Sequence, residues 1–182
     1  HGAYETSIEQ ATTDDPPDGA YFSRSGNELV APVIEGDSSH TIALWGDSFA
    51  VQYAPRYEKL TKTVKDFPRV VVMTYGGCPP LPHVNRNGVS WDGSPWRCDL
   101  FFEKSLAQLK NPSVRTIVLA AAWEDWLFGL ERFHSTNDPT HAPLNESGSA
   151  RKAVMDDFEK TIAELEKSGK RVYIVLSAPF GD

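Results

Sequence analysis

Residues 41–50 read Thr-Ile-Ala-Leu-Trp-Gly-Asp-Ser-Phe-Ala, a short apolar run that ends in a polar turn. Because the apolar run is continuous rather than alternating, it is typical of a strand that is buried on both faces. Gly46 permits a tight turn after the strand, and Asp47 and Ser48 follow at the expected start of a helix. The stretch therefore predicts a core strand whose end presents a serine.

Three more continuous apolar runs predict further buried strands. They span residues 69–74, 115–121 and 171–177. Between the runs, apolar residues recur at helical spacing. These stripes lie within residues 49–64, 102–109 and 154–165. Pro55 predicts a kink in the first helix, while Ser149 and Gly169 are the expected N-terminal cap and C′ residue of the third.

Regular alternation of strands and helices predicts an α/β fold with a parallel sheet covered on both faces. We expect one such domain over residues 39–182. Residues 1–38 lack sustained periodicity and predict an irregular linker, with a short strand near residues 29–33. Functional crevices of parallel sheets lie beyond the carboxyl ends of the strands. That rule selects the loops at residues 46–50, 75–81, 122–129 and 178–182.

The composition is that of a packed domain and excludes several functions. The chain has 182 residues, of which 40% are apolar and 24% charged. A net charge of −7 without a basic cluster argues against nucleic-acid binding. The longest apolar run is too short to cross a bilayer. No metal-ligand spacing or nucleotide-binding motif occurs, so neither a metal nor a cofactor is expected. From its two ends, we interpret the chain as a fragment or a processed domain.

Two of the selected loops contain residues suited to acyl chemistry. A serine at the start of a helix can attack a carbonyl while backbone N–H groups hold the developing oxyanion. Ser48 fits this role, although serine is also an ordinary capping residue. The second loop reads Tyr-Gly-Gly-Cys-Pro-Pro-Leu over residues 75–81. Its glycines, Gly76 and Gly77, offer unhindered N–H donors, and the alternative is a rigid turn without a ligand.

Cys78 and Cys98 are the two cysteines and lie twenty positions apart. With His83 as the one nearby histidine, they are too few for a zinc site. A disulfide between them would stabilise the domain by about 3 kcal/mol and would favour an oxidising compartment. Two buried free thiols are the alternative.

Taken together, these motifs resemble the SGNH (GDSL-type) hydrolases and acyltransferases. The resemblance is carried by Gly-Asp-Ser at 46–48, Gly-Cys-Pro-Pro-Leu at 77–81, Ala-Ala-Ala-Trp at 120–123 and Cys98. It is strongest to the SGNH domain that bacteria fuse to a membrane acyltransferase domain. The resemblance implies a three-layer, flavodoxin-like SGNH fold. It also implies a periplasmic domain, tethered to the inner membrane, that O-acetylates a cell-envelope glycan such as O-antigen or peptidoglycan. The membrane domain would supply the acyl group.

The resemblance assigns roles to individual residues. Ser48 takes the position of the nucleophile, and its own N–H and that of Gly77 are the expected oxyanion donors, with Gly76 less favoured. Trp123 stands where SGNH enzymes carry an asparagine, so its indole N–H is a further candidate donor. Trp126 and His83 are weaker candidates for contact with the substrate.

The general base is the largest departure from the family, because the chain lacks an Asp-x-x-His motif. We expect that motif to follow Asp182 in the parent protein. His40 precedes the first strand at the end opposite the serine, whereas His83 lies in a loop that can approach the site. His134 and His141 lie in a long polar stretch that can fold over the site as a lid.

Other readings remain open. Glu124 and Asp125 are adjacent on an expected extended loop, so they are poorly placed for a glycosidase pair. Trp91 and Trp96 lie near the predicted crevice and suit either sugar contact or packing. A catalytically inactive glycan-binding or scaffolding module is the main alternative to an acyltransferase, and a stand-alone carbohydrate esterase is the other.

Overall fold

The computed structural model describes residues 31–36, 38–90 and 93–176. These residues form a five-stranded sheet with the order β1-β3-β2-β5-β7. The strands are β1 (Val33–Ile34), β2 (Ser38–Gly46), β3 (Pro68–Thr74), β5 (Val114–Ala120) and β7 (Arg171–Val175). All neighbours are parallel except β1, which runs antiparallel to β3. The predicted α/β fold with a parallel sheet is confirmed.

The strand order shows where a site can form. After β2 the chain adds β3 on one side, and it then crosses over to add β5 on the other side of β2. Loops that leave such a switch point diverge and open a crevice beyond the carboxyl ends of the strands. Gly46, the last residue of β2, is in register with Thr74 at the end of β3 and with Ala120 at the end of β5. The general rule for parallel sheets therefore places the expected crevice where the predicted Gly-Asp-Ser turn begins.

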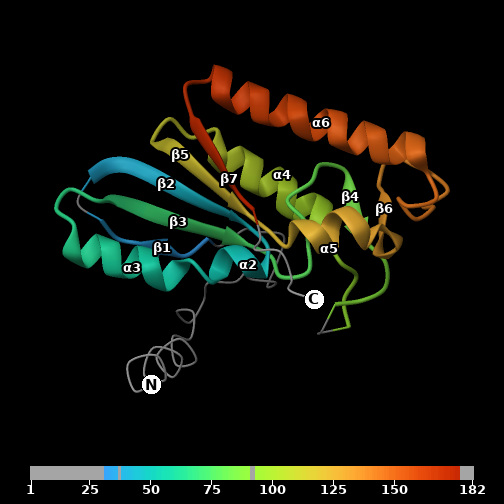
Figure 1. Ribbon diagram of the computed structural model, residues 1–182, viewed down its shortest axis with the longest axis horizontal. Coiled ribbons are helices and arrows are strands. Elements are labelled where there is room, and N and C mark those ends of the chain that lie inside the picture. The colour runs from blue at the N-terminus through green and yellow to red at the C-terminus, as the bar shows by residue number, and fades with distance from the viewer. Residues whose placement is uncertain (1–30, 37, 91–92, 177–182) are drawn as a thin grey trace.

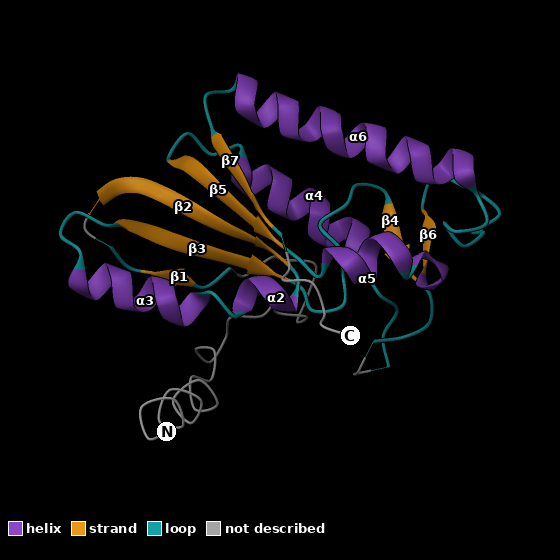
Figure 2. Ribbon diagram, in the orientation of Figure 1, coloured by secondary structure: helices purple, strands orange, loops and turns teal. Residues whose placement is uncertain are grey.

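Helices cover both faces of the sheet, which gives three layers (Figures 1 and 2). One face carries α2 (Ser48–Val51) and α3 (Ala54–Thr63), and the other carries α4 (Cys98–Leu109) and α6 (Gly148–Lys167). The larger of two buried apolar clusters lies under α4 and α6 and contains Trp45 and Phe101, while the smaller lies under α2 and α3. No helix in the described ranges is long and apolar enough to span a membrane.

Helix boundaries differ from the expectation at two places. The first predicted helix is divided into α2 and α3, because Pro55 has no N–H to donate to the carbonyl of Val51 and instead lies in the first turn of α3. The N-cap of α6 is Ser147, whose hydroxyl accepts a hydrogen bond from the N–H of Ala150, rather than Ser149. Gly169 follows α6 with a φ of +85°, as predicted for a C′ glycine.

Two elements were not expected. Strands β4 (Val84–Arg86) and β6 (Phe133–Ser135) form a small antiparallel sheet of their own. The segment after β5 forms a short helix, α5 (Trp123–Phe128), which is followed by the 3-10 turn η1 (Leu130–Arg132). The expectation of an extended loop around Glu124 and Asp125 is therefore wrong. The expected strand near residues 29–33 is described only from residue 31 onward, where β1 begins at Val33.

Candidate active site

The Gly-Asp-Ser turn places a serine at the carboxyl edge of the sheet. Ser48 lies two residues beyond the end of β2, as the first residue of α2, and its side chain is exposed. The helix has only four residues, so its dipole is weak, and any stabilisation of an anion must come from individual N–H groups. An exposed serine at this edge has the position that a nucleophile requires.

Gly46 allows β2 and β5 to approach each other at this edge. A Cβ atom at residue 46 would overlap the carbonyl oxygen of Ala120 on the neighbouring strand. Any other residue would push β5 away from β2 or shift the turn that carries Ser48. The glycine is therefore required by the close packing of backbone against backbone.

Asp47 holds the turn in place. One carboxylate oxygen accepts the N–H of Phe49 at 2.7 Å. The other oxygen accepts the N–H of Ala122 at 2.9 Å and the indole N–H of Trp126 at 2.5 Å. The side chain is completely buried. Burial raises the pKa of the Asp47 carboxyl, and the hydrogen bonds partly oppose that effect.

Asp47 therefore bridges the turn after β2 and the segment after β5. The sequence marks it as a capping residue, and the bond to Phe49 N–H confirms this part. The bridge itself was missed, because its partners are 75 and 79 positions away. A Gly-Asp turn after a buried strand gives no signal of such distant donors.

The diglycine segment forms a turn beside the serine. The carbonyl of Tyr75 accepts the N–H of Cys78 at 3.0 Å, and the N–H of Tyr75 donates to the carbonyl of Gly46 at 3.2 Å. Gly77 has a φ of +82°, which suits the third position of a type II turn and favours glycine. The hydrogen bond that closes the turn uses the N–H of Cys78, and so the N–H of Gly77 is not consumed by it. Gly76 is buried.

Cys78 and Cys98 form a disulfide, with their Cα atoms 5.2 Å apart. The predicted bond is confirmed over the alternative of two free thiols. Because Cys98 is the first residue of α4, the bond fastens the diglycine turn to the N-terminus of that helix. The side-chain oxygen of Asn85 also accepts the N–H of Cys98 at 3.0 Å.

Trp123, the further candidate donor to the oxyanion, makes its contacts with β7 and α6. Its indole N–H donates to the backbone carbonyl of Val175 in β7 at 2.8 Å. Its ring packs against Phe158 of α6, with 6.3 Å between ring centroids. Since an indole has a single N–H, this bond removes Trp123 as a donor to an oxyanion in this arrangement.

The two other described tryptophans near the Gly-Asp-Ser and diglycine turns, Trp96 and Trp126, are packed in the core. Trp126 is 7% exposed, packs edge-on against Phe133 and donates its N–H to Asp47. This leaves little of its surface for a sugar, and contact of Trp126 with substrate stays a prediction. Trp96 is also buried, and Trp91 lies outside the described residues.

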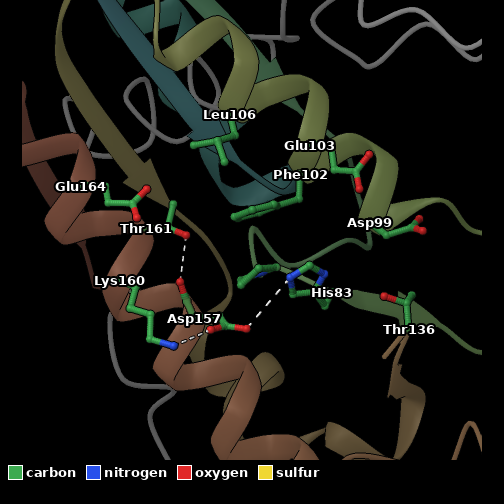
Figure 3. A pocket seen from close by; sticks show the side chains of 11 residues that line it. His83, Asp99, Phe102, Glu103, Leu106, Thr136, Asp157, Lys160, Thr161 and Glu164 are labelled. Atoms are coloured by element: carbon green, nitrogen blue, oxygen red, sulfur yellow. Dashed lines mark hydrogen bonds and ion pairs between the residues drawn. The ribbon is translucent and has the colours of Figure 1, made fainter. Parts of the chain in front are cut away.

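His83 faces a pocket on the α4 and α6 side of the sheet (Figure 3). The pocket has a volume of about 340 Å³, and the Nε2 atom of His83 lies 4.0 Å from a carboxylate oxygen of Asp157 on α6. None of the pocket residues belongs to the Gly-Asp-Ser turn or to the diglycine turn. His83 is thus directed toward α6, and its contact with substrate stays a prediction.

The other described histidines are His40, His134 and His141. His134 and His141 stack with 4.7 Å between ring centroids, and Nδ1 of His134 lies 2.7 Å from the side-chain oxygen of Asn87. His40 lies in β2, at the end opposite Ser48. His134 on β6 and His141 in the following loop therefore form a stacked pair beside the small second sheet.

Comparison with known proteins gives one family and one solved structure. The family described as an SGNH domain fused to AT3 domains matches residues 13–182. The comparison with curated proteins finds no match. Among solved structures, the chain is similar to the periplasmic domain of a lipopolysaccharide acetyltransferase from Salmonella ser. Paratyphi A, with 17% sequence identity and a TM-score of 0.45. The similarity covers 78% of this chain and 45% of that one, so this chain spans less than half of its length.

Proposed function

The chain belongs to the family of SGNH domains fused to AT3 domains, and on that premise we propose that it transfers an acetyl group to a hydroxyl of a bacterial cell-envelope glycan. The observation that carries this proposal is the exposed Ser48 at the sheet edge beside the Gly77 turn. The turns that hold both residues start at paired ends of β2 and β3 and are joined by the bond from Tyr75 to Gly46.

The proposed reaction has two steps. The Ser48 oxygen attacks the carbonyl carbon of an ester or thioester donor and forms a tetrahedral intermediate. The N–H groups of Ser48 and Gly77 hold its oxyanion, with Gly76 as the less favoured donor. Collapse breaks the bond to the donor's alcohol or thiol, which leaves with a proton, and acyl-serine remains. A sugar hydroxyl then attacks the acyl group, and Ser48 regains its hydroxyl.

The nucleophile must lose its proton to a base as it attacks. His40, His83, His134 and His141 are held elsewhere in the described part of the chain, so the proposal places the base outside these four residues. Asp47 is also unsuited to that role, because its carboxylate is buried and already accepts three N–H groups.

The acyl group would come from a membrane domain, and the reaction would take place in the periplasm. The family is one of domains fused to AT3 domains, which supports such a donor. The disulfide supports an oxidising compartment, because such bonds rarely persist in a reducing cytosol. The domain would accordingly be tethered to the inner membrane, with O-antigen or peptidoglycan as the acceptor.

Ser48→Ala tests the proposal in the full-length protein. Glycan acetylation, measured by mass spectrometry, should fall to background while the unfolding temperature stays close to wild type, because the exposed hydroxyl contributes little packing. Ser149→Ala is the matched control, since this exposed serine also lies in the first turn of a helix. Undiminished acetylation by Ser48→Ala would refute the role of the serine.

A second candidate function is an inactive glycan-binding or scaffolding module. The engagement of the Trp123 indole with Val175 favours it, because this leaves the site without that donor. A stand-alone carbohydrate esterase would instead hydrolyse the acyl-serine with water. An aryl acetate assay separates chemistry from the inactive module. Release of the aryl alcohol that is lost in Ser48→Ala supports chemistry, and no release by wild type supports the inactive module.

A further inference from the structure

A single arginine lies against the diglycine turn. The guanidinium carbon of Arg86, on β4, lies 4.6 Å from the centroid of the Trp96 ring. Its Nη1 donates to the carbonyl oxygen of Gly77 at 3.4 Å. Trp96 is 4% exposed, so the ring that supports the guanidinium is fixed in the core. Arg86 is thus held in a defined position beside a glycine of the proposed oxyanion hole.

Within residues 31–36, 38–90 and 93–176, no carboxylate neutralises the positive charge of Arg86. Among the described residues, Arg86 forms no ion pair, while the neighbouring Arg132 has Glu131 at 3.5 Å. Burial, followed by the charge of Arg132, lowers the pKa of Arg86. A half-buried guanidinium that lacks a counterion is less stable than a paired one, and a bound anion would relieve this.

In the described part of the chain, most of the N–H donors of the Arg86 guanidinium also have no partner. A guanidinium carries five N–H donors, and the structure assigns one long bond, to Gly77. A guanidinium stacked on an aromatic ring keeps its edge available for two parallel bonds to a carboxylate or phosphate. The chain as a whole has a charge of −7, so an acidic ligand is not attracted to its surface in general. Recognition of an anion must therefore come from local contacts of this kind.

We propose that Arg86 binds an acidic group of the acceptor glycan, a carboxylate or a phosphate, and thereby selects anionic sugars for acylation. This inference rests on the proposed function, because the site is taken to be the one that contains Ser48. Since Arg86 contacts Gly77, an acid group held by Arg86 lies next to the oxyanion hole. A hydroxyl on the same or the neighbouring sugar is then brought to the acyl-serine.

The test measures binding and does not depend on turnover. In a Ser48→Ala background, which prevents cleavage of ester probes, isothermal titration compares trigalacturonate with its uncharged methyl ester. A second pair, maltotriose phosphate and maltotriose, distinguishes a phosphate from a carboxylate. We expect the charged member of one pair to bind at least ~10-fold more tightly, as for the gain of a paired charge-assisted contact.

Variants of the arginines assign the selectivity. Arg86→Gln should reduce the affinity ratio of the selective pair to near one, and Arg86→Lys should give an intermediate ratio because it keeps the charge and loses the planar fork. Arg132→Gln is the control, because Arg132 ends the 3-10 turn η1 directly before β6, and this variant should keep most of the ratio. Thermal unfolding shows whether each variant is folded. If Arg86→Gln does not fold, the ratio of affinities for the charged and uncharged probes in Arg86→Lys tests the proposal instead.

Equal affinity within both pairs, no binding of any probe, or a ratio unaffected by Arg86→Gln and Arg86→Lys would overturn the inference. Equal losses in the Arg86→Gln and Arg132→Gln variants would overturn it as well, since they would show a general charge effect. Failure of the proposed function is seen separately, as acetylation that persists in full-length Ser48→Ala. If acetylation is lost in full-length Ser48→Ala but the binding of the probe pairs shows no charge selectivity, the proposed acyltransferase stands and the proposed role of Arg86 is refuted.

Discussion

Replacement of Asp47 should show how strongly the turn that carries Ser48 depends on one buried carboxylate. The carboxylate accepts the N–H groups of Phe49 and Ala122 and the indole N–H of Trp126. Two of these donors belong to the segment after β5. Removal of the carboxylate therefore leaves polar groups unpaired on both sides of the crevice, and it disconnects the turn of Ser48 from β5.

The size of the effect follows from the number of donors. A hydrogen bond to a charged group contributes about 1.5–3 kcal/mol, and an unpaired buried donor is unfavourable by about 1–3 kcal/mol. Burial of the Asp47 carboxylate is itself unfavourable, as the upward shift of its pKa indicates, and this offsets part of the stabilisation by the three hydrogen bonds. We expect Asp47→Ala to lower the free energy of unfolding by about 4 kcal/mol, below the simple total for three bonds. Asp47→Asn should lower the free energy of unfolding by about 2 kcal/mol, because its amide oxygen can still accept hydrogen bonds on one side of the former carboxylate.

The assay is urea unfolding followed by circular dichroism, combined with aryl acetate hydrolysis well below the unfolding midpoint. Asp125→Asn is the control, because this exposed carboxylate lies on α5 near Trp126. Hydrolysis should fall with both Asp47 variants even where they are fully folded, since the turn that carries Ser48 is no longer fixed. Two Asp47 variants as stable as wild type, or an equal loss in Asp125→Asn, would refute the reasoning.

Three further predictions concern the neighbouring features. Gly77→Ala should lose about 1–3 kcal/mol of stability and most esterase activity, because φ at this residue is +82° and the new Cβ would lie 2.6 Å from the Arg86 guanidinium. Wild-type values of the unfolding temperature and of the hydrolysis rate in this variant would contradict the turn geometry. Replacement of both Cys78 and Cys98 by serine should lower the free energy of unfolding by about 3 kcal/mol. An unchanged denaturant midpoint would contradict the stabilising effect of the disulfide. Burial and the neighbouring imidazole lower the pKa of His134 below 6.5, so its contribution to stability is complete above pH 6.5 and is lost as the pH falls through the folded-state value. His134→Gln should therefore flatten the fall in stability on acidification below pH 6.5, and an unchanged slope in urea titrations would contradict this assignment.

The core of the fold was predictable, because buried parallel strands leave a continuous apolar signal. The runs that predicted β2, β3, β5 and β7 all form strands, and their ends agree with the predicted ends to within three residues. The strands of the second sheet, β4 and β6, have three residues each and lie far apart in the chain, so no local pattern reveals them. Helix α5 was missed because its N-cap, Ala122, makes no side-chain capping bond.

At the site, sequence reasoning found the groups that a turn must expose and missed the groups that hold the turn. Ser48 and Gly77 follow predicted strands directly, so their place at the sheet edge could be derived. The partners of Asp47, Trp123 and Trp126 depend on α5 and on the packing of β7, which local sequence does not encode. Tryptophans near the expected crevice therefore suggested sugar contacts, whereas the N–H groups of Trp123 and Trp126 donate to groups within the fold.

The absence of a side chain at Gly46 has a consequence for mutational surveys of this protein. Substitution at this position should damage assembly of the sheet and presentation of Ser48 together, because the same atom would collide with β5 and displace the turn. Soluble yield and acetylation would then decline in parallel at residue 46, whereas at residue 48 they would separate. A library scored for abundance as well as for product would distinguish these two kinds of essential position without a further structure.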